Sequence, residues 1–573
     1  MSWIPDEKTK NELRHYAIQN AIEYNGKANA KSVIGRILSS RADLRSHAKD
    51  IQNIIHAEVD AANEHAAQHG LDSLIEILEN EAPQFLETRE KKEKKVGLTE
   101  LQKAEKGKVV LRFAPNPNGP LSIGHSRGLV INSQYRDMYD GELILRFDDT
   151  DTTVKPALLE AYEQIVEEAT WLTGKKPDRI VIASDRIETY YQHAEQMIRE
   201  DFGYVCRCSG EEFKVFRVSK KECPCRSNTS SKNLELWAMM LNGEFKPGDV
   251  VVRVKTEMEL KNPALRDWPA LRLQDTTAHP HPRPEIGSKY VVWPLLDFQS
   301  AVEDHLQGVT HIIRGKDLMD STRKQTLLYE HFGWTYPETM YWGRVKIHEW
   351  GGFSTSSIRE SIENGTYSSW DDVRLPTLSG IKNRGITAEA IRSFWLELGI
   401  SQKDISVPLS TLFAHNTKDV DLNAPRLAFI RNPMKFEFDS TFEPLVLQHH
   451  PNNVELGSKT WSCDSKTIYL ESKDIEHSKR LRLKECADIE LENGKLQFLS
   501  IERGKEKLPI VHWLPADMSR EGELKFTKDD EILTIQGRVE HHHLPPGTIV
   551  QLERIGYAKV VNEATLFLSY ENS

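Results

Sequence analysis

The chain has 573 residues, of which 39% are hydrophobic and 28% are charged, as is usual for a globular protein. This length exceeds what one hydrophobic core organises, so we expect roughly three to five domains. The formal net charge of -11 argues against non-specific nucleic-acid binding, although it is compatible with a local basic face. Apolar runs fall short of the roughly 18 residues that cross a bilayer, and the N-terminus lacks a signal-peptide pattern. We therefore expect a cytoplasmic protein that does not bind membranes.

The first 88 residues predict a small helical domain. Apolar residues recur at three- and four-residue steps around positions 11–14, 31–38, 51–55 and 71–78. Such a domain would pack on itself or dock a protein partner. Residues 89–108 are strongly charged and nearly free of large apolar side chains, which predicts a solvated linker, although its lysines could also contact phosphates.

A strand, a tight loop and a helix follow the linker. The alternating run 109–113 leads into a loop with three prolines and two glycines, and a helical pattern begins at Ser126. Gly124 and His125 stand at the helix entrance, where unpaired backbone N–H groups and a partial positive charge suit a phosphate. Many loops of this composition are only connectors, so the pattern alone leaves both interpretations open.

The next segments alternate between strands and helices. Strand patterns at 142–147 and 179–182 are separated by helical patterns near 126–139 and 157–172. This alternation predicts a parallel sheet with right-handed crossovers. Ligands bind beyond the carboxyl ends of such strands, so the loops at 116–125 and 148–151 should converge on one crevice.

Four of the six cysteines have the spacing C-x-C-x14-C-x-C. They are Cys206, Cys208, Cys223 and Cys225. Two close pairs separated by a loop supply four thiolates to a tetrahedral zinc ion, and a four-cysteine site is closed and structural. The alternative is a coincidence of buried free thiols.

After strand-forming residues at 249–254, the α/β pattern resumes with apolar runs at 290–298 and 309–317. Arg314 directly follows an apolar strand, which predicts either a pocket residue with an anionic ligand or an ordinary salt bridge. The glycine- and hydroxyl-rich loop 351–357, expected to lead into a helix at Ile358, would hold phosphate oxygens or be a simple turn.

Helical patterns are expected to continue to about residue 433, and short strands follow. Those strands are expected at 466–470, 496–501, 532–536 and 548–552, which predicts all-β barrels. The fold class is therefore multidomain α/β. We divide the chain into a helical domain (1–88), a linker (89–108), a Rossmann-like first half (109–203), an insertion with the cysteines (204–289), a second half (290–350), a loop with a helical connector (351–440) and β-barrels (441–573).

The ordered motifs resemble those of the class I glutamyl/glutaminyl-tRNA synthetases, specifically the archaeal and eukaryotic type. The likeness covers the chain from about Val109 onwards. Its HIGH-like motif comprises Pro115, Asn116, Pro117, Asn118, Gly119, Pro120, Leu121, Ser122, Ile123, Gly124 and His125, which ends in SIGH. Residues 146–151 resemble the acidic substrate motif, 308–315 the second-half strand, 352–356 the KMSKS loop, and 509–513 and 551–556 the barrel motifs.

This resemblance implies ATP-dependent attachment of L-glutamate to tRNA(Glu) through a glutamyl-adenylate, with Mg2+ as cofactor. It makes 204–289 an acceptor-binding insertion and 441–573 an anticodon-binding region. The implied catalytic and ATP-binding residues are Gly124, His125, Ser354, Thr355 and Ser356. The implied amino-acid-binding residues are Arg112, Ala114, Asn116, Asp148 and Arg314.

Arg314 favours glutamate, because a guanidinium grips a carboxylate with two charge-assisted hydrogen bonds and is left partly unpaired by an amide. Three departures from the family pattern stand out: Ser122 replaces a histidine, Leu296 replaces a tyrosine, and Gly352 and Thr355 replace two lysines. Lys316 or Arg344 could compensate for the lysines. The alternatives are a glutaminyl enzyme, an enzyme that also charges tRNA(Gln), and a non-catalytic tRNA-binding or scaffold paralogue.

Overall fold

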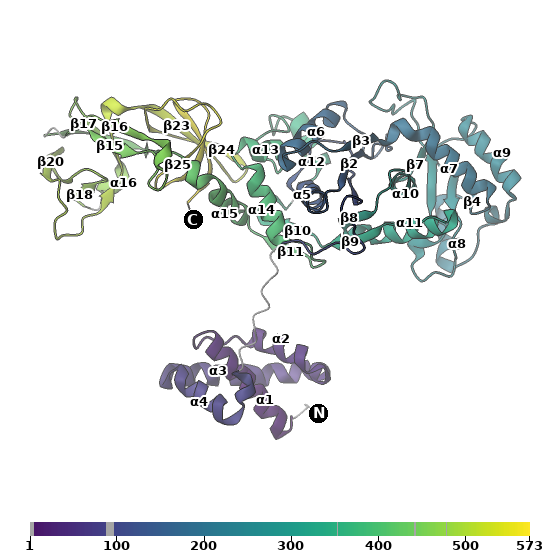
Figure 1. Cartoon of the computed structure of the whole chain (residues 1–573), viewed down its shortest axis with the longest axis horizontal. Coiled ribbons are helices and arrows are strands. Elements are labelled where there is room, and N and C mark those ends of the chain that lie inside the picture. The colour runs from purple at the N-terminus through teal and green to yellow at the C-terminus, as the bar shows by residue number, and fades with distance from the viewer. Residues whose placement is uncertain (1–4, 87–96, 352, 440–442, 477, 573) are drawn as a thin grey trace. The chain divides into compact units, whose positions relative to one another are not determined.

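The computed structural model describes residues 5–86, 97–351, 353–439, 443–476 and 478–572. The chain divides into two compact units, residues 1–96 and 97–573 (Figure 1). Of the expected linker, positions 89–96 lie outside the described residues. Leu101, which we expected in the solvated linker, is instead buried in the same apolar core as Leu111 and Leu143 of the parallel strands.

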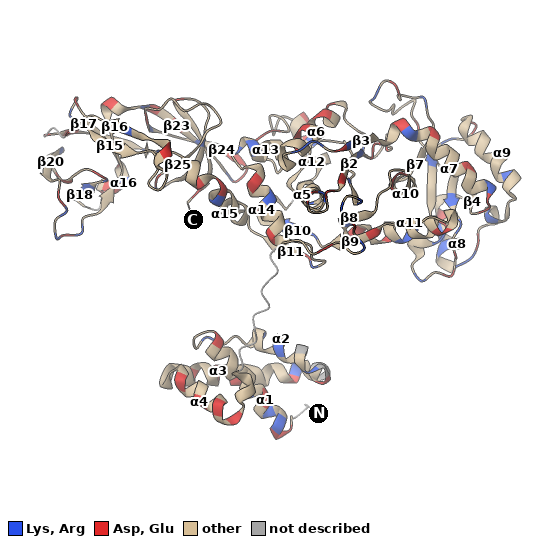
Figure 2. Cartoon of the chain, in the orientation of Figure 1, with Lys and Arg blue, Asp and Glu red and all other residues tan. Residues whose placement is uncertain are grey.

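The described part of the first unit contains four α-helices, as the apolar spacing predicts. They are α1 (Glu7–Glu23), α2 (Ala30–Ser40), α3 (Ala48–His69) and α4 (Leu71–Glu81). The side chains of Asp6 and Asn29 cap α1 and α2, and leucine and isoleucine side chains fill the interior. Figure 2 shows acidic residues along α4, so this helix does not present a surface for phosphates.

The second unit begins with the predicted parallel sheet. Its strands are β1 (Val110–Phe113), β2 (Glu142–Phe147) and β3 (Arg179–Ile182), joined by α5 (Ile123–Met138) and α6 (Leu159–Thr173). A second parallel pair, β8 (His311–Gly315) and β9 (Glu338–Trp342), lies beside β1, because the N–H of Thr310 donates to the carbonyl of Val110 over 3.0 Å. The loops that follow β1, β2 and β8 therefore share one edge.

A four-stranded antiparallel sheet with its own apolar core lies, in the sequence, between the strands β1–β3 and the pair β8–β9. Its strands are β4 (Gly203–Cys206), β5 (Val251–Val254), β6 (Pro269–Leu273) and β7 (Val292–Pro294). The helices α7 (Ile187–Arg199), α8 (Gly210–Ser219) and α9 (Ser230–Leu241) come before or between these strands in the sequence. The helices α10 (Leu296–Leu306) and α11 (Met319–Phe332) follow the last of them. The apolar run 290–298 is thus a short strand followed by the start of α10.

The connector is shorter than expected. It contains α12 (Thr355–Glu363), α13 (Leu378–Asn383), α14 (Ala388–Leu398), α15 (Leu409–Val420) and the parallel pair β10 (Val345–Ile347) and β11 (Ile405–Val407). The helices end at Val420, because Pro425 interrupts the pattern and the next residues pair with β25, so the expectation of helix to about 433 was wrong. The helix expected at Ile358 begins at Thr355, because the hydroxyl of Ser354 caps it.

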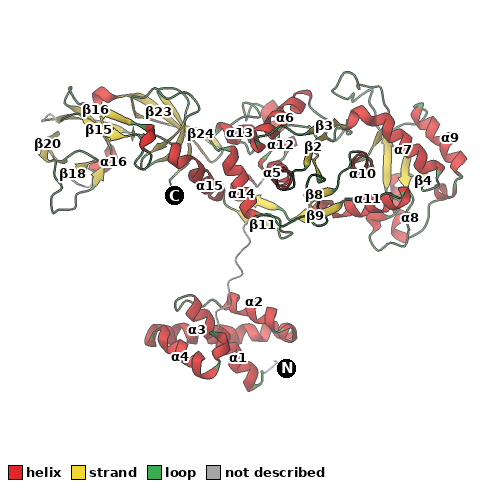
Figure 3. Cartoon of the chain, in the orientation of Figure 1, coloured by secondary structure: helices red, strands yellow, loops and turns green. Residues whose placement is uncertain are grey.

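The C-terminal part contains the expected short strands, which form two seven-stranded sheets (Figure 3). One contains β12 (Arg426–Leu427), β13 (Phe429–Arg431), β23 (Ser519–Lys528), β24 (Glu531–Glu540), β25 (Ile549–Leu552), β26 (Gly556–Val560) and β27 (Thr565–Glu571). The other contains β14 (Pro433–Phe438), β17 (Thr467–Glu471), β18 (Arg480–Leu483), β19 (Asp488–Glu492), β20 (Lys495–Ser500), β21 (Ile510–Val511) and β22 (Trp513–Pro515). The C-terminal part also contains a separate hairpin, β15 (Leu445–Gln448) with β16 (Ser458–Trp461), and the short helix α16 (Ser472–Ile475). Within the described residues, no helix combines the length and apolar character that a bilayer crossing requires.

Candidate functional site

Two adjoining cavities lie at the carboxyl edge of the parallel sheet. The smaller has a volume of about 220 Å³ and the larger about 690 Å³. Both are lined by Gly124, His125, Gly315 and Trp342, so the two spaces meet at the entrance of α5. The loops after β1 and β2 thus converge on one crevice, as the sequence predicts.

Buried charges surround the smaller cavity. Arg146 donates to Asp304 Oδ1 and to Asp148 Oδ1, each over 2.7 Å, and Arg112 Nε donates to the same Asp304 oxygen over 3.2 Å. Burial alone would raise the pKa of Asp304, but the charges of the neighbouring arginines lower it below its ordinary value. Asp304 therefore remains an anion that two arginines share.

Arg314 completes the cationic wall of this cavity. Its side chain is buried, and Nη2 donates to Gln325 Oε1 over 3.0 Å and to Tyr336 Oη over 3.2 Å. Both partners are neutral groups, and Nε of Arg314 has no hydrogen-bond partner among the described residues. The cavity therefore has a buried positive charge that needs an anionic ligand.

The structure brings four of the five expected amino-acid-binding residues into this cavity. Arg112, Ala114, Asp148 and Arg314 line it. Asp148 Oδ1 also accepts from Gln299 Nε2 over 2.9 Å, which fixes the carboxylate. Asn116 is not among the lining residues; its amide nitrogen instead donates to the carbonyl of Lys155 over 3.1 Å. The tyrosine position of the family is taken by Leu296, a half-exposed side chain on the cavity wall.

His125 lies where the two cavities join. Because α5 begins at Ile123, Gly124 and His125 occupy its first turn, where backbone N–H groups lack partners within the helix. Nδ1 of His125 accepts from the N–H of Ser122 over 3.2 Å. A nitrogen that accepts from a backbone amide carries no proton, so the neutral ring is protonated on Nε2 and is able to donate to a phosphate oxygen.

The rest of the HIGH-like motif forms the loop between β1 and α5. The carbonyl of Pro115 accepts from the N–H of Asp148 over 3.0 Å, and that of Pro117 from the N–H of Leu158 over 2.8 Å. These bonds attach the loop to the segment after β2. A Cβ on Gly119 would lie 2.7 Å from Thr355 Cγ2, so only glycine permits the close approach of the two predicted substrate loops.

The KMSKS-like loop reaches the larger cavity only in part. Ser354 and Thr355 line it, whereas Ser356 does not. The hydroxyl of Ser354 accepts from the N–H of Ser357 over 3.1 Å, which fixes the start of α12. Gly352, which we aligned with a lysine of the motif, lies outside the described residues.

Several residues around the crevice carried no usable sequence signal. Asp304 is an unremarkable polar position in a helix pattern, yet it is fully buried against two arginines. Arg127 follows the HIGH-like motif, and its guanidinium lies 5.5 Å from the ring centroid of Trp342 and 5.6 Å from that of Trp395. Its Nη1 donates to the carbonyl of Gly343 over 2.7 Å. Only the long-range packing identifies these residues.

The four expected cysteines converge beside β4. Their sulfur atoms all lie within 4.8 Å of one another, and the pairs Cys206–Cys223 and Cys208–Cys225 are each 3.9 Å apart. Four thiolates around zinc, with Zn–S bonds of about 2.3 Å, would have their sulfurs ~3.8 Å apart. The donor set and its spacing thus fit a tetrahedral zinc ion.

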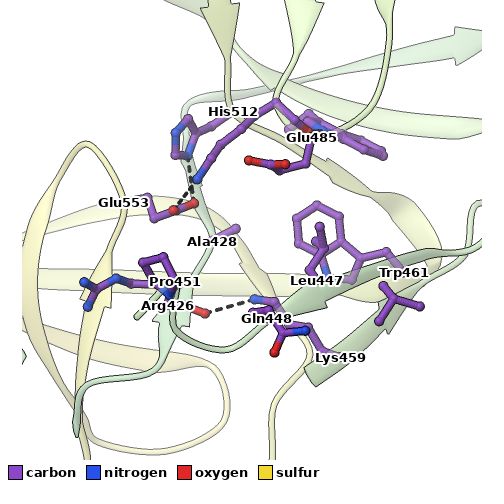
Figure 4. Close-up of a pocket in the computed structure, with 13 residues that line it drawn as sticks. Arg426, Ala428, Leu447, Gln448, Pro451, Lys459, Trp461, Glu485, His512 and Glu553 are labelled. Atoms are coloured by element: carbon purple, nitrogen blue, oxygen red, sulfur yellow. Dashed lines mark hydrogen bonds and ion pairs between the residues drawn. The ribbon is translucent and has the colours of Figure 1, made fainter. Parts of the chain in front are cut away.

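A separate cavity of about 350 Å³ lies between the two C-terminal sheets. Figure 4 shows Arg426, Trp461, His512 and Glu553 around it. Glu553 forms an ion pair with Lys484, which joins the two sheets at this point. Aromatic rings beside cationic side chains are the surfaces on which unpaired nucleic-acid bases stack.

The fold is that of a multidomain α/β protein whose parallel sheet has two adjoining cavities at its carboxyl edge, where ligands bind in such sheets. The family model described as "tRNA synthetases class I (E and Q), catalytic domain" matches residues 108–422, and the model for the anti-codon binding domain matches 424–502. The chain belongs to this family of class I tRNA synthetases.

Individual relatives agree with the family match. A glutamate–tRNA ligase of Methanosarcina mazei is 42% identical over 96% of both chains, and one of Archaeoglobus fulgidus is 43% identical over 96% of this chain and 97% of its own. A crystal structure of a glutamate tRNA ligase from Elizabethkingia meningosepticum is 20% identical over 55% of this chain and 70% of its own, with a TM-score of 0.39.

Proposed function

We propose that this chain attaches L-glutamate to tRNA(Glu) through a glutamyl-adenylate. The observation that carries the proposal is the buried guanidinium of Arg314, whose hydrogen-bond partners are both neutral, in a cavity that opens onto the HIGH-like helix entrance. The relatives of nearly full length named above, which carry the name glutamate–tRNA ligase, support the same conclusion.

In the first step, the α-carboxylate of glutamate attacks the α-phosphate of ATP and pyrophosphate leaves. The chain has little covalent chemistry to perform, so it acts by positioning the reactants and stabilising charge. The smaller cavity holds glutamate, with Asp148 facing its ammonium and Arg112 beside its carboxylate. The larger cavity holds ATP, and His125, at the junction, donates to a phosphate oxygen. In the second step the glutamyl group passes to the terminal ribose of the tRNA.

Arg314 selects glutamate over glutamine. Its neutral partners, Gln325 and Tyr336, orient the guanidinium without neutralising it. A side-chain carboxylate supplies the missing charge, whereas an amide leaves the cation unpaired in a buried site. That difference is on the order of 3–5 kcal/mol, which corresponds to at least a hundredfold preference.

Two metal ions belong to the proposal. Mg2+ would neutralise part of the triphosphate charge, and Asp317 is the one carboxylate among the described residues that line the larger cavity. Zn2+ would be held by Cys206, Cys208, Cys223 and Cys225 and would stabilise the fold of the insertion, without a part in the reaction.

The tRNA would contact the chain at two places. The insertion would receive the acceptor end, and the cavity between the C-terminal sheets would receive an anticodon base, because it combines Trp461 and Trp513 with Arg426 and Lys459. Docking of a protein partner by the N-terminal helices stays a prediction.

Glutamate-dependent exchange of pyrophosphate into ATP, measured with and without tRNA, tests the proposed reaction. We expect exchange with glutamate and not with glutamine, and charging of tRNA(Glu). A parallel charging assay with tRNA(Gln) determines whether that tRNA is also a substrate. Preferential use of glutamine would identify a glutaminyl enzyme, and tRNA binding without exchange or charging would identify a scaffold.

A further inference from the structure

The KMSKS-like loop contains no lysine. Residues 351–357 read GGFSTSS, so the loop offers hydroxyls and backbone N–H groups but no positive charge. The pyrophosphate that leaves ATP carries several negative charges, and its bridging oxygen gains charge as the bond to the α-phosphate breaks. Another cation at the larger cavity must therefore face this group.

Four cationic side chains line the larger cavity: Arg127, Lys155, Arg344 and Lys346. Arg127 is occupied, because its two terminal nitrogens donate to the carbonyls of Gly343 and Gly399. The backbone N–H of Arg344 donates to Asp404 Oδ1 over 2.6 Å, and the hydrogen bond and charge of Lys316, together with the charge of Arg344, lower the pKa of this carboxyl group, so Asp404 partly neutralises Arg344. Burial and the charge of Lys155 lower the pKa of His125, which places Lys155 at the junction of the two cavities. Lys316, which we expected to compensate for the missing lysines, does not line the cavity and is paired with the same Asp404 over 2.8 Å.

Lys346 lies in the middle of β10. Its neighbours Val345 and Ile347 pack into the core, so strand alternation places Lys346 on the opposite, exposed side. Among the residues that the structure describes, its ammonium has no hydrogen-bond or ion-pair partner. The side chain extends along Gly351, the first residue of the loop: a Cβ on Gly351 would lie 2.5 Å from Lys346 Cε and 3.3 Å from Nζ.

We propose that Lys346, from β10, supplies the positive charge that the KMSKS-like loop lacks, by contacting the β- and γ-phosphates of ATP and the departing pyrophosphate. This inference rests on the proposed function. In the step, a bond forms between a carboxylate oxygen of glutamate and the α-phosphorus. The bond from that phosphorus to the bridging oxygen breaks, and its electron pair leaves with pyrophosphate. Lys346 stays protonated throughout and acts only through its charge, which is most favourable when the oxygen is most negative.

The Lys346→Ala variant of the full chain tests the proposal by ATP–pyrophosphate exchange. We expect kcat/KM for ATP to fall by about ten- to a hundredfold, the KM for pyrophosphate in the reverse reaction to rise, and the KM for glutamate to stay the same. Lys346→Arg should retain most of the activity, because it keeps the charge. Lys403→Ala is the matched control: this exposed lysine precedes β11 beside β10 and lies outside the cavity, so its removal should change none of these values.

Gly351→Ala provides a second, independent test. The φ angle of Gly351 is -73°, which alanine adopts readily, so the substitution should displace only the end of Lys346. We expect it to lower exchange in the wild-type background and to have no further effect in Lys346→Ala. Kinetics of Lys346→Ala equal to those of an active wild type, or additive effects of the two substitutions, would overturn the role of Lys346. A wild type without glutamate-dependent exchange would instead overturn the proposed function.

Discussion

Nδ1 of His125 accepts a hydrogen bond from the backbone N–H of Ser122, and the hydroxyl of Ser122 lies 3.2 Å from the same nitrogen. Ser122 stands where the family usually has the first histidine of its signature. Ser122 lines the larger cavity, so the substitution leaves a short hydroxyl there in place of an imidazole. Orientation by the backbone N–H does not depend on the side chain at position 122.

Ser122→His should raise the rate of glutamate-dependent ATP–pyrophosphate exchange. The new imidazole adds a donor to a phosphate while the backbone bond to His125 is kept, and a donor at a developing charge contributes severalfold or more in rate. Exchange kinetics at saturating glutamate measure the effect. Ser122→Ala is the control and should lower the rate by less than about tenfold, since only the hydroxyl contact is lost. An unchanged rate in Ser122→His would mean that other residues already supply this contact.

Arg314→Ala should lower kcat/KM for glutamate by at least about a hundredfold. The carboxylate of the substrate would then enter a buried cavity without its cation. The KM for ATP should stay close to the wild-type value, because Arg314 lines the smaller cavity and not the larger one. Steady-state exchange at varied glutamate measures the change, and a thermal melt checks that the fold is retained. Normal glutamate kinetics in the variant would refute the assignment.

The sequence predicts those parts of this site that local patterns encode. The strands at 110–113 and 142–147, the loops at their carboxyl ends and the cysteine cluster all follow from spacing and composition. The role of Asp304 does not, because its partners Arg112 and Arg146 stand 192 and 158 positions away. Long-range pairing of that kind leaves no periodic trace, and the same reason explains why the amide of Asn116 bonds to the carbonyl of Lys155 and does not line the expected pocket.

Removal of zinc should destabilise the insertion locally. Chelation of the purified chain, or Cys223→Ser, should expose residues 200–230 to protease while the rest of the chain remains resistant, because the two cysteine pairs lose the ion that joins them. Elemental analysis and limited proteolysis measure the two effects. Cys486→Ala, at a buried thiol of the C-terminal sheets, should leave the zinc content unchanged. Absence of zinc together with unchanged proteolysis would contradict the metal site.

Glu168 of α6 links the HIGH-like loop to the connector. Its Oε2 accepts from the N–H of Leu121 over 2.7 Å, and its Oε1 lies 2.7 Å from the hydroxyl of Ser379. Next to it, the N–H of Leu378 donates to the carbonyl of Leu121 over 2.8 Å. Burial raises the pKa of Glu168 from 4.5 to about 7, despite these hydrogen bonds. The carboxyl group therefore takes up a proton in the folded chain at a pH where the unfolded chain has already lost it.

Stability of the second unit should fall as pH rises from about 4.5 to about 7, since the folded state binds more protons than the unfolded state across this window. Glu168→Gln should abolish this part of the pH dependence. The amide keeps an acceptor for Leu121 and a donor for Ser379 and has no charge to bury, so at pH 8 the variant should be more stable, by at most about 3 kcal/mol. Near pH 5 the two proteins should melt at similar temperatures. Calorimetric melts at pH 5 and pH 8 measure the difference, with Glu160→Gln, at an exposed position two turns earlier on α6, as the control. Equal pH dependence in wild type and Glu168→Gln would show that Glu168 is ionised in the folded chain throughout this range.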